Sequence, residues 1–390
     1  MNIVQDFKIP YHYEIAFTEG LFTEGNTLLA DILQQKLDAK KSVKVAIVLD
    51  EGLAEARPSL LSDIHKYFQQ NEAVYLAADP LKVKGGEDVK NDTGECMKVL
   101  ELVDKAKIDR HSFLLIIGGG AVLDMAGFAA SIAHRGIRHI RVPSTVLSQN
   151  DSGVGVKNGI NFFGKKNFLG AFVPPFAVIN DFTLLDSLSD RDWLSGIAEA
   201  VKVSLIKEKA FFEWLEQNAI ALKNRDMAAM KQLIFDCARL HSDHISNSND
   251  PFEMGSSRPL DYGHWAAHKL EQLTNFGLKH GEAVAIGLAL DLIYGNLSGF
   301  MDDQQTERAI HVLQEVGFNL FHSELLNEAQ DGINPELLKG LEEFREHLGG
   351  ELTITMVGQI GSKFDVHEMD AKKLEKAVLL LKERNEHYAY

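Results

Sequence analysis

Three stretches of this 390-residue chain combine residue types that could do chemistry. In the first, the apolar run Phe113-Leu-Leu-Ile-Ile leads into Gly118-Gly119-Gly120 and then into a helical pattern that contains Asp124. Glycine lets a ligand approach the backbone closely, and a helix N-terminus attracts phosphate. The spacing is not Gly-x-Gly-x-x-Gly, so the common dinucleotide fingerprint does not strictly apply. The pattern therefore predicts either a phosphate-binding loop or a plain tight turn between strand and helix.

The second stretch is a glycine-rich segment that gathers cations between residues 135 and 170. It contains Arg135, Lys157, Lys165 and Lys166 with few neighbouring acids, although the whole chain has a formal charge of −16. Loops that concentrate cations are suited to hold a phosphorylated substrate. A solvated loop can have the same composition, so the composition does not decide between the two interpretations.

The third stretch lies in the second half of the chain and consists of acids, histidines and a lysine at helical spacing. Glu199 and Lys202 are three residues apart, His264 and His268 are four apart, and His280 follows after a turn. One glutamate and two or three histidines can hold a divalent metal and leave coordination positions open for a substrate. The chain has 15 histidines, so pairs at this spacing are also expected by chance. The pattern alone therefore does not decide whether these histidines bind a metal or have a structural role.

The elements that must position these residues change character along the chain. Apolar runs at 43–50, 73–77, 113–117 and 176–179 predict strands, with amphipathic helices at 59–70 and 91–107 between them. Such alternation predicts an α/β domain with a mostly parallel sheet. From residue 181 the spacing is helical, with one strand-like run at 351–356. The helical stretches are 190–208, 210–224, 227–246, 264–273, 282–297 and 303–316. We therefore expect an α/β domain at 1–180 and a helical domain at 181–390, with a hinge between Pro174 and Leu188.

Composition excludes several classes of protein. The 40 basic and 56 acidic residues give 40 − 56 = −16, which argues against a nucleic-acid binder or a protein of anionic membranes. Two cysteines, Cys96 and Cys237, cannot form a disulfide framework or a cysteine-type zinc site. The first residues show no basic segment leading into an apolar one, and no apolar run reaches about 18 residues. We expect a soluble, cytoplasmic globular protein.

Taken together, the motifs resemble those of 3-dehydroquinate synthase and the related sugar phosphate cyclases. In chain order they are Gly118-Gly119-Gly120 with Asp124, Arg135-Gly136, Pro143-Ser144-Thr145, Gln149 with Asp151-Ser152, Lys157 with Gly159-Ile160-Asn161, Lys166-Asn167, Ala198-Glu199 with Lys202, Gly263-His264, and His280-Gly281-Glu282-Ala283-Val284. The resemblance covers roughly residues 40 to 300 and keeps the motifs in the same order across both expected domains.

The resemblance implies a fold, two cofactors and a set of site residues. It implies an N-terminal NAD-binding α/β domain, an all-α C-terminal metal-binding domain, an active site between them, and a homodimer. It implies Zn²⁺, or Co²⁺ in some members, held by Glu199, His264 and His280. The residues implied to bind NAD are Asp50, Glu87, Lys90, Gly118, Gly119, Gly120, Asp124, Ser144, Thr145, Lys166 and Thr183. Those implied to face a sugar phosphate substrate are Arg135, Asp151, Lys157, Asn167, Lys202, Arg258 and His268. We expect Asp261, which departs from the family pattern, to face the substrate as well.

The reaction that the resemblance implies has four parts. A secondary alcohol of the substrate is oxidised transiently, phosphate is eliminated, the ketone is reduced again, and an intramolecular aldol step closes a carbocycle. Arg135, Lys157 and Lys166 would offset the phosphate charge, and His268 would assist proton transfer.

The chain departs from the family pattern at positions that we expect to line the substrate pocket. Asp261 stands where an asparagine is usual, Trp265 follows the metal histidine in place of threonine, and a lysine expected near residues 240–250 is missing. Arg258 is one residue nearer the metal histidine than expected. The late Asp-Lys-Lys motif is replaced by residues 343–350. A sugar phosphate without a carboxylate, as used by valiolone- or deoxyinosose-forming cyclases, is therefore an alternative substrate.

Two other classes also remain. Metal-dependent polyol dehydrogenases of the glycerol dehydrogenase type share a Gly-Gly-Gly turn and a helical metal domain, but they need no cluster of phosphate-binding lysines. A non-catalytic relative could keep the fold as a binding protein. The full set of Glu199, Lys202, His264, His268 and His280 argues against that class, since an inactive site need not retain it.

Overall fold

The computed structural model describes residues 2–34, 42–248, 250–255, 257–347 and 350–388. The chain divides into two compact units. Unit 1 comprises Met1–Ser148 and Ser152–Ser187, and unit 2 comprises Gln149–Asp151 and Leu188–Tyr390. The boundary thus follows Ser187, whereas the sequence pattern placed it at residue 180. In addition, three residues from the first half of the chain belong to unit 2.

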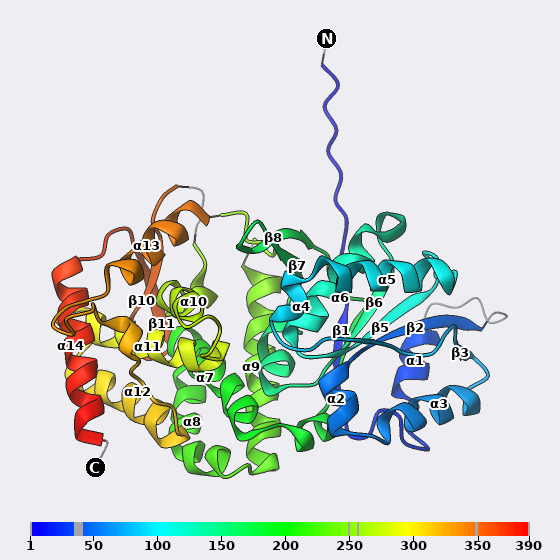
Figure 1. Ribbon diagram of the computed structural model, residues 1–390, viewed down its shortest axis with the longest axis horizontal. Coiled ribbons are helices and arrows are strands. Elements are labelled where there is room, and N and C mark those ends of the chain that lie inside the picture. Colours follow the sequence, from blue (N-terminus) through cyan, green and yellow to red (C-terminus); the bar gives the residue numbers. More distant parts are fainter. Residues whose placement is uncertain (1, 35–41, 249, 256, 348–349, 389–390) are drawn as a thin grey trace. The chain divides into compact units, whose positions relative to one another are not determined.

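Unit 1 is built on a seven-stranded parallel sheet (Figure 1). Its strands are β1 (Glu14–Thr18), β2 (Val43–Asp50), β3 (Val74–Leu76), β4 (Leu81–Val83), β5 (Phe113–Gly118), β6 (Arg138–Pro143) and β9 (Ala177–Asp181). The order is β1-β9-β6-β5-β2-β3, and β4 also pairs with β2. The four expected strands are confirmed as β2, β3, β5 and β9. The sequence pattern missed β6 because Arg138, His139 and Arg141 interrupt its apolar run.

Helices cover both faces of this sheet, which explains why its strands are apolar without alternation. Val45 and Ile47 of β2 join the core on one face, with α1 (Leu28–Gln34) and α3 (Leu60–Gln70). Ala46 and Val48 join the core on the other face, with α5 (Thr93–Lys105) and α6 (Gly120–Ile132).

The direction of the chain across the sheet reverses between β2 and β5. From β2 the chain continues to β3 and β4 at one edge, and from β5 it continues to β6 and β9 towards the other edge. In open α/β sheets such a reversal leaves a crevice outside the carboxyl ends of the strands, where ligands bind. Asp50 ends β2 and Gly118 ends β5, so two of the expected cofactor residues lie at this position.

A separate antiparallel hairpin completes unit 1. It consists of β7 (Lys157–Phe162) and β8 (Lys165–Phe172). Residue Asn158 of β7 packs against Gly127 of α6, where an added Cβ would lie 2.0 Å from the Asn158 Oδ1 atom. Gly127 is therefore required for the close approach of helix and hairpin.

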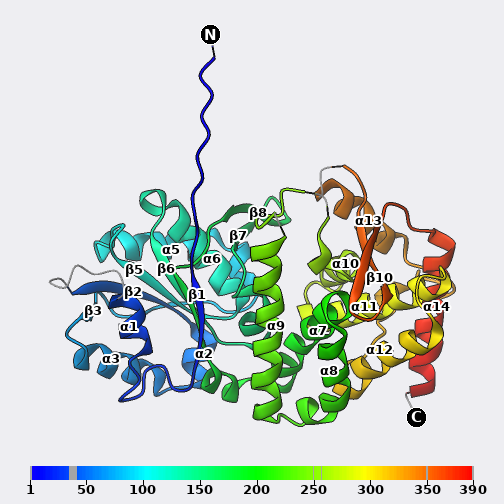
Figure 2. The same ribbon diagram turned by 180° about the vertical axis from the view of Figure 1, so that it is seen from behind.

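Unit 2 is mainly helical, as expected. Its helices are α7 (Asp190–Lys207), α8 (Lys209–Lys223), α9 (Met227–Asn247), α10 (His264–Leu273), α11 (His280–Leu297), α12 (Asp303–Val316), α13 (Pro335–His347) and α14 (Ala371–Tyr388). The sequence pattern missed α13 and α14. Helices α7, α8 and α9 pack against one another (Figure 2). The strand expected at 351–356 is part of a hairpin of β10 (Ile354–Gln359) and β11 (Ser362–Val366). Among the described residues, no helix is both long and apolar enough to span a bilayer.

Candidate active site

The glycine loop of unit 1 contains one glycine that packing does not require. A Cβ on Gly118 would lie 2.9 Å from the side chain of Val122, and one on Gly120 would lie 2.4 Å from the Ser152 hydroxyl oxygen. Gly119, the N-cap of α6, differs: its nearest neighbour would be a Thr145 methyl carbon at 3.5 Å, an ordinary contact. Gly118 and Gly120 are therefore explained by packing. Gly119 faces space within unit 1, which fits a phosphate group at the start of a 13-residue helix.

Asp50 lies beneath this loop. Its carboxylate caps α2 (Glu51–Ala56) by accepting a hydrogen bond from the Leu53 N–H at 3.2 Å, and the N–H groups of Gly52 and Gly119 also donate to it. Burial raises the pKa of Asp50 above its ordinary value, and these three hydrogen bonds oppose the rise. A Cβ on Gly85 would lie 2.8 Å from the carboxylate oxygens. Asp50 thus joins the ends of β2 and β5 through backbone contacts.

The other expected cofactor residues also follow the carboxyl ends of strands. After β4, Lys90 is 3% exposed, and its Nζ lies 3.0 Å from Asp124 Oδ2 and 3.8 Å from Glu87 Oε1. After β6, the Ser144 N–H donates to the Gly118 carbonyl at 2.9 Å. Unit 1 therefore brings these residues to the same edge of the sheet as the glycine loop.

Thr145 and Thr183 complete this edge through local turns. The hydroxyl oxygen of Thr145 lies 2.8 Å from the Ser148 hydroxyl. Thr183 follows β9, and its hydroxyl donates to Asp181 Oδ1 at 2.8 Å. Each threonine is thus held at the end of a parallel strand.

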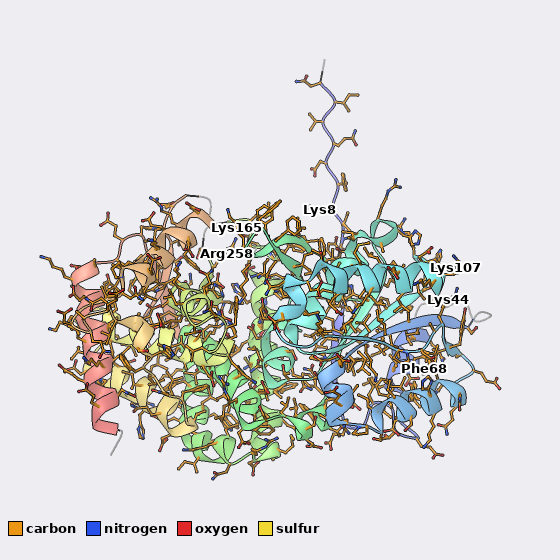
Figure 3. The ribbon with its side chains drawn as sticks, viewed as in Figure 1. Lys8, Lys44, Phe68, Lys107, Lys165 and Arg258 are labelled. Carbon is orange, nitrogen blue, oxygen red and sulfur yellow. The ribbon has the colours of Figure 1, made fainter. Side chains whose placement is uncertain are left out.

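The loop cations do not form one cluster. Lys157 opens β7 opposite Phe172, whereas Lys165 opens β8 opposite Phe162 at the other end of the hairpin. At about 3.4 Å per residue, five steps separate the two ends by about 17 Å. Lys165 lies at the surface of the hairpin (Figure 3). Lys166, next to Lys165, therefore lies near the end of the hairpin opposite to Lys157.

Arg135 and Asn167 are both exposed residues with left-handed backbone, at φ values of 63° and 53°. Arg135 ends the short turn after α6. The Asn167 N–H donates to Asn161 Oδ1 at 2.8 Å, and the Asn161 amide in turn donates to Asn91 Oδ1 at 2.9 Å. Asn161, which was part of the motif but not of the predicted site, thus positions Asn167.

A buried arginine that sequence reasoning missed holds the chain segment leading to Lys157. Arg141 of β6 is fully buried. Its guanidinium donates to the carbonyls of Gly155 and Lys157, each at 2.8 Å, and to Asn158 Oδ1 at 2.7 Å. Further carbonyls, those of Ser152 and Gly153, lie within 3.3 Å. An arginine inside an apolar strand is a signal that could have identified this role.

The three expected metal ligands of unit 2 meet around one carboxylate oxygen. Glu199 of α7 is fully buried, and its Oε1 lies 3.5 Å from His264 Nε2 and 3.2 Å from His280 Nε2. One ligand atom from each residue lies within 4.8 Å of the other two. The opposite ring nitrogens have partners of their own: His264 Nδ1 lies 3.0 Å from the Tyr262 carbonyl, and His280 Nδ1 lies 3.2 Å from Glu271 Oε2.

This arrangement fits a catalytic metal. Hydrogen bonds at Nδ1 fix the imidazole tautomer and leave both Nε2 atoms directed at the Glu199 oxygen, as the outer partners of zinc ligands do. Two histidines and one glutamate are a ligand set that leaves a fourth position open for substrate. Glu271, an orienting partner, was not predicted from the sequence.

His268 belongs to a different group from His264, although the two are four residues apart on α10. It forms, with Glu271 and His280, a second group whose ligand atoms are close enough to hold a metal ion, and its ring stacks on His280 with centroids 5.9 Å apart. The rings of His264 and His268 contact each other, with centroids 5.3 Å apart, but only His264 is grouped with Glu199, whereas His268 is grouped with Glu271, three residues later on α10.

A buried chain of charges adjoins the metal cluster. The Lys202 ammonium pairs directly with Glu199, lies 3.9 Å from Asp151 Oδ1, and is 2% exposed. Burial alone lowers the pKa of Lys202, but the charges of Glu199 and Asp151 outweigh it and bring that pKa above its ordinary value. Burial raises the pKa values of Glu199 and Asp151, but the Lys202 charge outweighs it and lowers both. All three groups are therefore charged at neutral pH.

Helix α9 supplies a further residue that the sequence did not single out. His241 Nδ1 lies 3.0 Å from Asp151 Oδ1, and the side chain is largely buried. The segment around His241 is the one in which the expected lysine is missing. His241 thus places an imidazole at the Asp151 carboxylate, in the segment where the family pattern has a lysine that this chain lacks.

Of the positions that depart from the family pattern, Asp261 keeps its expected place near the charges. It is one of the carboxylates that raise the pKa of Lys202. Arg258 is half-buried beside the β10–β11 hairpin, where its carbonyl lies 3.5 Å from the Thr355 hydroxyl. Residues 343–347 belong to α13, where Glu343 pairs with Lys269 of α10, and residues 348–349 lie outside the described residues.

The pocket expectation is wrong for Trp265. This side chain is 1% exposed, and its indole N–H donates to Asp291 Oδ1 of α11 at 2.9 Å. The Gly263 N–H donates to the other oxygen of Asp291 at 3.1 Å. Residues on both sides of His264 are thus tied to one buried carboxylate. Burial raises the pKa of Asp291 to about 7. The tryptophan is a core residue that helps to position a metal ligand.

Comparisons with known proteins identify the family of this chain. The family model described as 3-dehydroquinate synthase N-terminal matches residues 80–195, and the one described as 3-dehydroquinate synthase C-terminal matches residues 196–333. A 3-dehydroquinate synthase of Rhodopseudomonas palustris (strain BisB18) is 35% identical over 354 residues, which are 89% of each chain.

Solved structures show the same fold. The 2-epi-5-epi-valiolone synthase ValA from Streptomyces hygroscopicus, solved with NAD⁺ and Zn²⁺, matches with a TM-score of 0.86 and 24% identity over 98% of this chain and 99% of ValA. A 2-deoxy-scyllo-inosose synthase, complexed with carbaglucose-6-phosphate, NAD⁺ and Co²⁺, matches with a TM-score of 0.74 and 21% identity over 93% and 95% of the two chains. From the two family matches and the full-length relative, this chain belongs to the 3-dehydroquinate synthase family.

Proposed function

We propose that this protein is an NAD- and metal-dependent sugar phosphate cyclase that eliminates phosphate and closes a carbocycle. The observation that carries this proposal is the cluster of Glu199, His264 and His280 beside the buried Lys202 ammonium, in a chain of the 3-dehydroquinate synthase family. When bound, NAD⁺ accepts and returns a hydride, and Zn²⁺ or Co²⁺ polarises the oxygen of the reacting alcohol.

The buried charges of unit 2 define what the side chains do to the substrate. Lys202 stays protonated because its pKa is raised, so its Nζ stabilises negative charge on a substrate oxygen instead of acting as a base. Asp151 stays ionised because its pKa is lowered, so it accepts a hydrogen bond from a substrate hydroxyl. His268, beside Glu271 rather than Glu199, is the group that exchanges a proton with the substrate.

Lys157 and Lys166, two lysines of the hairpin in unit 1, bind different anionic groups in this proposal. We assign Lys157, which opens β7 and whose carbonyl Arg141 holds, to the substrate phosphate together with Arg135. Lys166, at the other end of the hairpin, is assigned to the cofactor. The positions of the two lysines near opposite ends of the hairpin, about four residues or about 14 Å apart along the strand, support this division.

The surplus of carboxylates around Lys202 favours a substrate that lacks a carboxylate. With Glu199 committed to the metal, Asp151 and Asp261 are the two carboxylates left to act on this single ammonium. Two like charges about 4 Å apart repel by about 1 kcal/mol in water and about 4 kcal/mol at an effective dielectric of 20. A heptulosonate carboxylate would add to this surplus, whereas a sugar hydroxyl would donate to it. We therefore propose a ketose or aldose phosphate as the preferred substrate.

The test is a phosphate-release screen of heptulose, heptulosonate and hexose phosphates with NAD⁺ and Zn²⁺ or Co²⁺. A cyclase releases one phosphate per turnover without net NADH. Accumulation of NADH without phosphate would instead identify a polyol dehydrogenase, and no reaction with any substrate would favour a non-catalytic relative. A preference of about tenfold or more in kcat/KM for the heptulosonate phosphate would establish ordinary 3-dehydroquinate synthase activity, which the curated relatives favour.

A further inference from the structure

His280, one of the three expected metal ligands, is the first residue of α11. The first four N–H groups of a helix have no partner within the helix, so this turn needs partners from elsewhere. Lys279, the N-cap of α11, cannot supply them, because an ammonium accepts no hydrogen bond and its charge opposes the positive end of the helix dipole. The local sequence therefore leaves the turn that carries His280 poorly fixed.

Helix α7, which packs against α11, supplies the missing partners (Figure 2). The Ser195 hydroxyl accepts a hydrogen bond from the Gly281 N–H at 3.1 Å. The Asp192 carboxylate pairs with the Lys279 ammonium and offsets its charge. The two helices lie very close here, since a Cβ on Gly281 would be 1.9 Å from the Ser195 carbonyl oxygen. The first turn of α11 is thus capped by α7 rather than by its own sequence.

Arg191 of α7 adds a bidentate contact that reaches both sides of His280. Its Nε donates to Glu282 Oε1 at 2.7 Å, and its Nη2 donates to Glu282 Oε2 at 2.5 Å. The same Nη2 donates to the Gly277 carbonyl at 3.1 Å. Glu282 Oε2 also accepts a hydrogen bond from the Lys279 N–H at 2.9 Å. Arg191 therefore connects the loop before His280 to the helix after it.

The face of α7 that holds α11 is also the face that presents Glu199. Arg191, Ser195 and Glu199 follow one another at intervals of four residues, so they lie on one side of the helix. At about 1.5 Å per residue, about 12 Å of helix separates Arg191 from Glu199. Glu199 Oε1 lies 3.2 Å from His280 Nε2. The distance between these two ligands therefore depends on how α11 is fixed on α7.

A metal tolerates little variation in that distance, because Zn–N and Zn–O bonds are about 2.0–2.2 Å long and a working site needs its ligands placed within about 0.5 Å. We propose that Arg191 is a positioning residue for the metal. Its fork on Glu282 fixes the first turn of α11 on α7 and so sets the distance from His280 to Glu199. This role rests on the proposed function, because it requires that both ligands bind a metal.

Two simpler roles for Arg191 predict different results. The side chain is 53% exposed, and ion pairs in contact with water contribute little to global stability. Its positive charge repels a metal cation, so removal of the charge alone would strengthen metal binding. Weaker metal binding without Arg191 therefore reports the position of the ligands and neither stability nor charge.

The first test compares dissociation constants of Zn²⁺, measured by competition with a chelating dye. Arg191→Gln should raise the dissociation constant about tenfold, as loss of an outer partner of a metal ligand does. The matched control is Arg308→Gln. Arg308 makes the same bidentate contact, with Glu216 at 2.9 and 2.7 Å, but it joins α12 to α8, which carry no expected ligand.

The control variant should bind Zn²⁺ as the wild type does. Both variants should keep the unfolding temperature within about 4 °C of the wild type, because each removes one exposed ion pair. Wild-type affinity in Arg191→Gln, or an equal loss of affinity in both variants, would overturn the proposal.

The second test reads the geometry of the site from the visible absorption of bound Co²⁺ at saturating metal. The spectrum should change in Arg191→Gln and also in Arg191→Lys, because lysine keeps the charge but not the fork. It should remain that of the wild type in Arg308→Gln. Arg191→Gln combined with Glu282→Gln should bind Zn²⁺ no more weakly than the weaker single variant, since both remove the same contact. A wild-type spectrum in Arg191→Lys, or additive losses in the double variant, would contradict positioning through this contact.

One further variant distinguishes failure of the positioning role from failure of the ligand assignment. If His280→Ala keeps wild-type affinity for Zn²⁺, His280 is not a ligand, and both the assignment and the positioning role are wrong. If His280→Ala loses Zn²⁺ while Arg191→Gln keeps the wild-type affinity and spectrum, the assignment stands and only the positioning role is wrong.

Discussion

The glycine loop of unit 1 and the metal cluster of unit 2 differ in which part of the chain forms the binding site. The loop is built from backbone: β5 ends in Gly118, α6 begins at Gly120, and Gly119 between them has room that no side chain of unit 1 fills. The cluster is built from side chains, with Glu199, His264 and His280 delivered by three different helices. A backbone site depends on one residue having no side chain, whereas a side-chain site depends on helices being held in register. Substitutions should therefore affect the two regions differently.

The largest effect should come from removing a metal ligand. His280→Ala should weaken metal binding by more than about 100-fold, beyond the range for an outer partner, because it removes one of three ligand atoms. His268→Ala is the matched control and should keep stoichiometric metal while losing turnover. Metal content measured after gel filtration checks both. If His268→Ala empties the site and His280→Ala does not, the ligand assignment is wrong.

A side chain on Gly119 should harm only the cofactor site. Gly119→Val should weaken NAD binding by about two orders of magnitude because its side chain would occupy space next to the pyrophosphate. The metal content and the unfolding temperature should remain, since a Cβ at this position meets only an ordinary 3.5 Å contact. Calorimetric titration of NAD⁺ measures the effect, and unchanged affinity would remove Gly119 from the site.

Gly127→Ala provides the contrast. Its Cβ would lie 2.0 Å from Asn158 Oδ1, so this variant should be destabilised by about 1–3 kcal/mol, the usual cost of overpacking. A stable Gly127→Ala variant would mean that the hairpin yields more easily than its contacts indicate.

Loss of the Trp265 indole donor should have a moderate effect on metal binding. Trp265→Phe leaves Asp291 with the Gly263 N–H alone, so His264 is held less firmly and metal affinity should fall by about 10-fold, up to 100-fold. Trp193→Phe is the matched control. That indole is equally buried and donates to the Leu222 carbonyl at 2.8 Å, away from the cluster. If the two variants have equal metal affinities, the Trp265–Asp291 hydrogen bond does not help to position His264.

Asp261→Asn should change substrate preference rather than binding of either cofactor. Removing this carboxylate from the surroundings of Lys202 should narrow the gap in kcat/KM between substrates with and without a carboxylate by about tenfold, which corresponds to about 1.4 kcal/mol. Asp243→Asn, which removes a charge from an exposed position on α9, is the control and should leave the ratio unchanged. An unchanged ratio in Asp261→Asn would mean that the Lys202 charge cancels that of Asp261.

The smallest effect should be a contrast in the pH dependence of local stability. Burial, aided by the Arg141 charge, lowers the pKa of His139 in unit 1 from 6.5 to about 3. Below pH 6.5 this histidine therefore binds a proton in the unfolded chain but not in the folded one, and the free energy of unfolding of unit 1 decreases as the pH falls. Burial raises the pKa of Asp291 in unit 2 from 3.8 to about 7. Between these values the aspartate is ionised in the unfolded chain but protonated in the folded one, so the free energy of unfolding of unit 2 decreases as the pH rises from 3.8 towards 7.

Hydrogen exchange of each unit at pH 5 and pH 7.5, corrected for the intrinsic rates, measures this contrast. Protection of β6 should increase with pH, and protection of α11 should decrease. The same trend in both units would show that other titrating groups dominate.

Local sequence was sufficient for the regions whose chemistry is continuous along the chain. The run from Phe113 to Gly120 predicted both β5 and the turn that follows it, because hydrophobic pattern and glycine content act over a few residues. Helices α7 to α12 of unit 2 were equally readable from their spacing, whereas α13 and α14 were missed. The strand β6 was not readable, because its buried Arg141 is stabilised by carbonyls 11 to 16 residues later, which no local pattern reveals.

The sequence identified which residues belong to the site, but it did not show which of them lie together. The motifs supplied Glu199, His264, His268 and His280, yet the spacing alone could not separate His268 from His264. Glu271 follows His268 by three residues on α10, whereas only the packing of α10 and α7 against α11 brought His264 and His280 to Glu199. The same packing placed Trp265 in the core against Asp291 of α11, 26 residues later, and brought Glu271 to His280. Helix α9, which packs against α7, brought His241 to Asp151, 90 residues earlier. The physical reason is that an α/β turn is set by neighbouring residues, whereas a charge buried among helices is stabilised only by partners that tertiary structure brings to it.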